Sequence, residues 1–315
     1  APPDVSLAFL PAHGARRAVA NLKQMAFSRQ SIGRTMLYGW IEFDGNMYLQ
    51  QNSVVGARQL LEFAKALTGA DQVAGAALNH WRTAENRVCI AYAARAFIQG
   101  PIDPAAFYRQ YARVLGLEDA GRFASIMQEL DDLDDLAREK MFNIGFCANS
   151  CWIRPGLRWT QRWDNGAIDA ARQRYRDAIG EMEACLESAA RPAGRELLRF
   201  LINRVECTLL QLECAQTMKS LAAFCDHEHP DRLTAGQKQE VKDACARAMA
   251  LSQRYLAKHA EAILDRGCEG MLISYQTTIP NYIEHIRAVF VEGEKTCRHF
   301  LPQLDEPPPP KTVES

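Results

Sequence analysis

The stretch Thr35-Met-Leu-Tyr-Gly-Trp-Ile-Glu-Phe43 predicts a β-strand, and the fold class follows from it. The stretch is rich in aromatic and aliphatic residues and runs into Asp44-Gly45, a pair typical of turns. A second short strand is predicted over Val73-Ala-Gly-Ala-Ala-Leu78, which leads into Asn79-His80-Trp81-Arg82. An apolar helical period runs from Val54 to Leu67 between them. Strands that begin about 38 residues apart with a helix between them are typical of consecutive βα units in a parallel sheet or barrel.

The end of the first strand carries two carboxylates in an aromatic setting. Glu42 and Asp44 follow Trp40, and chemistry in parallel sheets is concentrated at the carboxyl ends of the strands. A carboxyl group there can act as a nucleophile, or as an acid whose pKa is raised by apolar surroundings. The structural alternative is that Glu42 pairs with an arginine and that Asp44-Gly45 only forms a turn.

The end of the second strand carries the cluster His80-Trp81-Arg82. A tryptophan offers a flat apolar face for a sugar ring, while histidine and arginine supply hydrogen bonds to hydroxyl or carboxylate groups. The structural alternative is that Trp81 anchors the strand to the following helix and that Arg82 pairs with Glu85.

A third cluster combines Trp152, Trp159 and Trp163 with several arginines in a predicted loop over 152–166. Clustered aromatic and arginine side chains suit carbohydrate stacking, a protein interface or single-stranded nucleic acid. The alternative is that the three tryptophans fold inward and fix the loop to the helices. A formal net charge of −1 makes nucleic acid the least favoured ligand.

The rest of the chain is predicted to be helical, apart from an irregular start over 1–14. A long helix is expected from Pro192 to about Cys225, and Thr234-x-x-Gln237 predicts a capping box for a helix that ends near Asp265. Gly267 and Gly270 are expected to separate it from a last helical region, which Pro280 kinks or restarts. The remaining helices are predicted over 15–30 and 53–68, from Thr83 as the cap, from Asp103-Pro104, and over 119–146 and 167–190.

Composition and motifs exclude several classes of protein. The sequence contains no apolar run long enough to cross a bilayer, so no membrane span is expected. It contains no nucleophile elbow, P-loop or dinucleotide-binding glycine motif, so no cofactor is expected. The scattered cysteines at 185, 207, 214, 245 and 297 are expected to be buried free thiols, whereas Cys147 and Cys151 could form a bridge or bind metal. Asp226-His-Glu-His229 is interpreted as a helix end, and no metal site is predicted. The acidic run 131–135 is interpreted as a solvated helix face, with Leu130, Leu133 and Leu136 pointing inward.

The order of these features resembles the closing portion of a (β/α)8 glycoside hydrolase. It is most similar to bacterial enzymes with an α-helical domain after the barrel, such as alpha-glucuronidases and some hexosaminidase-like families. Three motifs over about 100 residues carry the resemblance. They are Leu37-Tyr-Gly-Trp-Ile-Glu-Phe-Asp44, Leu78-Asn-His-Trp-Arg-Thr-Ala-Glu85 and Phe107-Tyr-x-x-Tyr-x-x-x-Leu-Gly116. The resemblance implies that Glu42 stands where such hydrolases place a nucleophile or second carboxylate.

The sequence therefore predicts a mainly α fold, in which two βα units from the end of a parallel barrel precede an antiparallel helical bundle. The expected divisions are 1–100 for the barrel-like part, 101–304 for the helical domain and 305–315 for a disordered proline-rich tail. The expected function is glycosidic bond cleavage, as the C-terminal part of a larger hydrolase whose barrel an upstream domain or another chain completes. The expected catalytic residues are Glu42 and Asp44. The residues expected to bind carbohydrate are Trp40, His80, Trp81, Arg82, Trp152, Trp159 and Trp163. The alternative is a non-catalytic helical module that completes a partner's sheet.

Overall fold

The computed structural model describes residues 7–9, 35–40, 73–79, 83–100, 102–139, 164–225 and 233–293, and these are mainly α-helical. The predicted helices over 15–30 and 53–68, the tail over 305–315 and the chain between the ranges lie outside the described residues. The elements are β1 (Leu7–Phe9), β2 (Thr35–Trp40), β3 (Val73–Asn79), α4 (Thr83–Gln99), α5 (Pro104–Leu115), α6 (Ala120–Glu139), α8 (Asn165–Glu187), α9 (Pro192–Cys225), α10 (Ala235–Ala260) and α11 (Arg266–Phe290).

The three strands form a parallel sheet in the order β1-β2-β3. The strands β2 and β3 lie in the two predicted stretches, and their pairing is parallel. The strand β1 was not expected, because the first 14 residues were predicted to be irregular. Its three residues pair with Thr35–Leu37. The strand β1 therefore depends on backbone pairing with residues far away in the sequence, and a local sequence pattern does not reveal such pairing.

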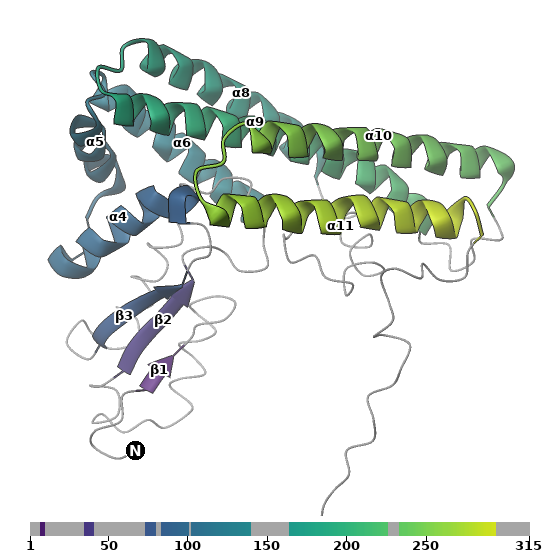
Figure 1. Ribbon diagram of the computed structural model, residues 1–315, viewed down its shortest axis with the longest axis horizontal. Coiled ribbons are helices and arrows are strands. Elements are labelled where there is room, and N and C mark those ends of the chain that lie inside the picture. The colour runs from purple at the N-terminus through teal and green to yellow at the C-terminus, as the bar shows by residue number, and fades with distance from the viewer. Residues whose placement is uncertain are drawn as a thin grey trace, which may run out of the picture.

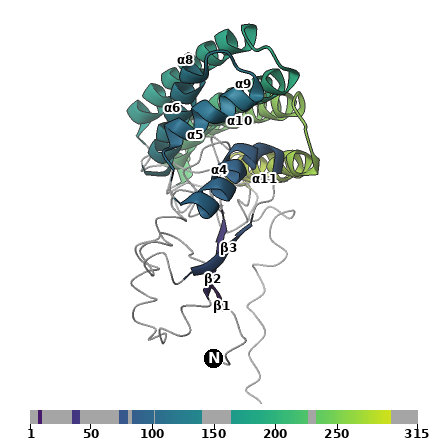
Figure 2. The same ribbon diagram turned by 90° about the vertical axis from the view of Figure 1, so that its left-hand side faces the viewer.

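The helices form a series in which neighbours along the chain are also neighbours in space. In this series α5 packs on α6, α6 on α8, α8 on α9, α9 on α10 and α10 on α11. Figure 1 shows α9, α10 and α11 lying along one another with alternating direction. Figures 1 and 2 both place the sheet on one side of the bundle, beside α4 and α11. The helix α4 therefore connects the last strand to the bundle.

Helix ends follow local chemistry where a polar cap is present. Asp103 caps α5, and its carboxylate accepts a hydrogen bond from the Ala106 amide at 2.8 Å. The predicted capping box at the start of α10 is present, with reciprocal bonds between Thr234 and Gln237. The predicted bounds of α9 agree with the structure. The helix α8 begins at Asn165, slightly before the predicted end of the preceding loop.

The predicted boundary between the last two helices is wrong. The helix α10 ends at Ala260 rather than near Asp265, because Asp265 is the N-cap of α11. Gly267 and Gly270 therefore lie inside the first turns of α11 rather than before it. Pro280 also lies within α11, so no new helix begins at this residue.

The core contains large aromatic and aliphatic side chains from every helix of the bundle. Leu130 and Leu133 are fully buried, as predicted for the inward face of α6. Asp131 is also buried, which contradicts its predicted place on a solvated face. The hydroxyl of Tyr108, itself fully buried, donates to the Asp131 carboxylate, with oxygens at 2.8 and 3.0 Å. A buried carboxylate needs such a partner, and here α5 provides it.

The described cysteines are buried free thiols. This confirms the prediction for Cys185, Cys207, Cys214 and Cys245, whereas Cys147, Cys151 and Cys297 lie outside the described residues. Within the part of the chain that the structure describes, no helix is both long and apolar enough to span a bilayer.

Burial raises the pKa of the Cys245 thiol to about 11 from its ordinary value of 9.0, and Glu284 adds to this rise against the opposing charge of Arg287. The folded state then holds the thiol proton more tightly than the unfolded state, so the free energy of unfolding falls as pH rises above about 9. We predict that the free energy of unfolding falls by about 1 kcal/mol less between pH 8 and pH 10 in Cys245→Ala than in the wild type.

Urea denaturation at the two pH values measures this difference. The cavity left by the substitution lowers stability at both pH values, so only the change with pH reports on the thiol. An identical pH dependence in the wild type and the variant would contradict the prediction.

Candidate functional site

The two longer strands end side by side at one edge of the sheet. Trp40, the last residue of β2, is the partner of Asn79, the last residue of β3. The shorter strand β1 ends at Phe9, whose partner Leu37 lies three residues before the end of β2. In sequence, Glu42 and Asp44 follow the end of β2, and His80 follows the end of β3 directly. The described pairing therefore places the last residues of β2 and β3, after which these residues follow in sequence, at one edge of the sheet.

Among the nine predicted site residues, Trp40 belongs to a described strand. The others lie outside the described residues: Glu42, Asp44, His80, Trp81, Arg82, Trp152, Trp159 and Trp163. The cluster Asp226-His-Glu-His229 lies outside them as well. Across the described ranges, no group of three or more histidine, cysteine, aspartate or glutamate side chains is arranged to hold a metal ion.

An aspartate of the bundle contacts the first turn of α4, the helix that follows β3 in sequence. In sequence, His80-Trp81-Arg82 stand between Asn79, the last residue of β3, and Thr83, the first residue of α4. The carboxylate of Asp265, at the start of α11, accepts a hydrogen bond from the Ala84 amide at 2.9 Å. A local pattern can indicate that Asp265 is the N-cap of α11, but it does not reveal this contact with a distant helix.

The bundle also has an open groove of about 970 Å³ at the end where α8 leads into α9 and α10 leads into α11. Its apolar lining includes Leu186, Phe200, Ile263 and Leu264. Its charged lining includes Glu196, Glu206 and Glu261. Leu264 directly precedes Asp265, whose carboxylate accepts from the Ala84 amide, so this side of the groove lies close in space to the start of α4.

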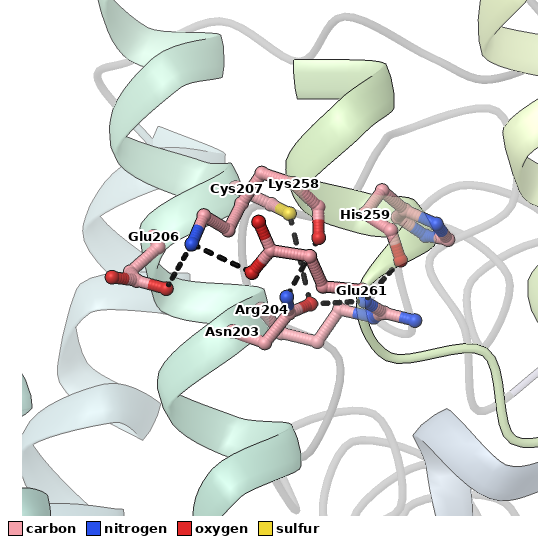
Figure 3. Close-up of polar contacts among 7 residues, drawn as sticks. All are labelled: Asn203, Arg204, Glu206, Cys207, Lys258, His259 and Glu261. Atoms are coloured by element: carbon pink, nitrogen blue, oxygen red, sulfur yellow. Dashed lines mark hydrogen bonds and ion pairs between the residues drawn. The ribbon is translucent and has the colours of Figure 1, made fainter. Parts of the chain in front are cut away.

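Three glutamates of this groove take part in ion pairs between helices or near helix ends. Glu196 pairs with Arg87 of α4 at 3.2 Å. Lys258 pairs with Glu206 at 3.2 Å and with Glu261 at 2.8 Å, as Figure 3 shows. The hydrogen bond from Lys258 to Glu261 raises the pKa of the lysine, with a further contribution from Glu206. A lysine held in its charged form is unsuited to act as a base or nucleophile, so this cluster is structural.

The end of α10 is capped by side chains from α9. Arg204 donates to the carbonyl of Ala262 at 2.7 Å and to that of His259 at 3.4 Å, and Asn203 donates to the carbonyl of Lys258 at 2.7 Å. Figure 3 shows these residues converging on the last turn of α10. The final carbonyls of a helix lack intrahelical partners and carry partial negative charge, so a buried guanidinium suits this position. The guanidinium carbon of Arg204 also lies 4.5 Å from the centre of the Phe200 ring.

We predict that Arg204→Met lowers the free energy of unfolding by about 3 kcal/mol, because it leaves buried carbonyl groups without their donor. Chemical denaturation followed by circular dichroism measures the loss. The matched control is Arg199→Met, which removes an exposed arginine from the same helix and should change stability by less than about 0.5 kcal/mol. Equal effects of the two substitutions would show that the cap carries no special weight.

No protein-family model matches this chain, and no curated protein matches it either. The function is therefore argued from the residues and from the arrangement of the strands.

Proposed function

We propose that this chain is carbohydrate-active and forms the C-terminal part of a glycoside hydrolase. The observation that supports the proposal is the parallel pairing of β2 and β3, whose last residues Trp40 and Asn79 are partners. Parallel sheets and barrels carry their active sites at this end of the strands. The two strands form part of the end of the barrel in this proposal, and the bundle is the helical domain that follows it.

Glu42 and Asp44 are the proposed catalytic carboxylates of this chain, and the upstream domain or other chain that completes the barrel brings the strands that supply the partner acid. Glycosidases cleave the bond with two carboxyl groups, one of which protonates the leaving oxygen while the other attacks the sugar or activates water. Apolar neighbours such as Trp40 favour the protonated form of a nearby carboxyl group, which separates the two roles. In the bundle groove, Glu206 and Glu261 both bind Lys258, and Glu196 pairs with Arg87.

The sugar itself is bound by aromatic and hydrogen-bonding side chains. Trp40 and Trp81 stack on the apolar faces of sugar rings, and His80 and Arg82 donate to hydroxyl or carboxylate groups. Trp152, Trp159 and Trp163 cover the site in this proposal. No cofactor is needed for acid and base catalysis of this kind.

We predict that Glu42→Gln abolishes hydrolysis, and that Trp81→Ala weakens sugar binding about tenfold or more because it removes a stacking surface. Calorimetry with chito-oligosaccharides and glucuronic-acid-substituted xylo-oligosaccharides measures binding, and aryl glycosides of the same sugars measure hydrolysis. Circular dichroism checks that the helical content of each variant is unchanged.

The matched control is Glu240→Gln, which changes an exposed glutamate on α10 in the same way. This variant should bind and hydrolyse like the wild type. A wild-type protein that binds none of these sugars, or a pair of site variants that behave like it, would refute the proposal.

A second candidate function is a helical module whose strands complete the sheet of another chain. Within the described sheet, β1 and β3 are the outer strands and each pairs with β2 alone. Open edges of this kind can accept a further strand. This function predicts no sugar binding, and a particle mass that rises with protein concentration as the edges associate. Light scattering over a range of concentrations measures the mass, and a constant monomer mass together with sugar binding would exclude it.

A further inference from the structure

We draw no further inference here: the strongest candidate, the open groove of about 970 Å³ between the end of α8, the first half of α9 and the connection from α10 to α11, carries no proposal because nothing in the structure shows what covers it.

Discussion

Burial of α9 between α8 and α10 is the constraint on which the rest of the structure depends. This helix runs over 34 residues from Pro192 to Cys225, and its buried side chains include Leu197, Leu201, Val205 and Leu212. A helix this long gains most of its stability from packing rather than from its own propensity. Its two neighbours along the chain both pack on it, and α5 contacts it as well. The order of the helices in the bundle follows from covering this one.

Covering α9 also buries polar groups, and these determine how the helices meet. Arg204 and Asn203 lie among the apolar positions of α9, and both donate to carbonyls at the end of α10. A buried donor without an acceptor is costly, so the end of α10 is fixed relative to α9 by more than apolar contact. Asp131 and Tyr108 fix α6 relative to α5 in the same manner. Apolar burial thus brings the helices together, and a few buried polar contacts determine their exact alignment.

The features that sequence predicted are those encoded by neighbouring residues. The capping box of Thr234 and Gln237, the Asp103 cap and the bounds of α9 all depend on residues within a turn of each other. One error is local, because the glycines at 267 and 270 lie inside α11 rather than before it. The others involve partners far along the chain. Asp131 was assigned to a solvated face because the pattern of α6 says nothing about Tyr108 on α5. The strand β1 was missed because its order comes from pairing with β2.

At the candidate site too, some features can be predicted from the sequence and others depend on contacts between distant residues. The residue types at the strand ends suggest sugar chemistry, and the strand pairing that brings the ends together involves residues about 40 positions apart, which the spacing of βα units predicts. The bond between Asp265 and the Ala84 amide could not be predicted, because no local pattern relates residue 265 to residue 84. Only the packing of α11 beside α4 brings the two helix starts to one carboxylate.

The contact between Asp265 and Ala84 ties the bundle to the helix that follows the sheet. Near the same end of the bundle, Lys258 binds both Glu206 and Glu261. A short connection between a strand and a helix is held in one place only when both of its sides are fixed. Pairing with β2 fixes the strand, and the bundle fixes the helix through Asp265. The bundle therefore restricts where α4 begins relative to the strand that precedes it in sequence.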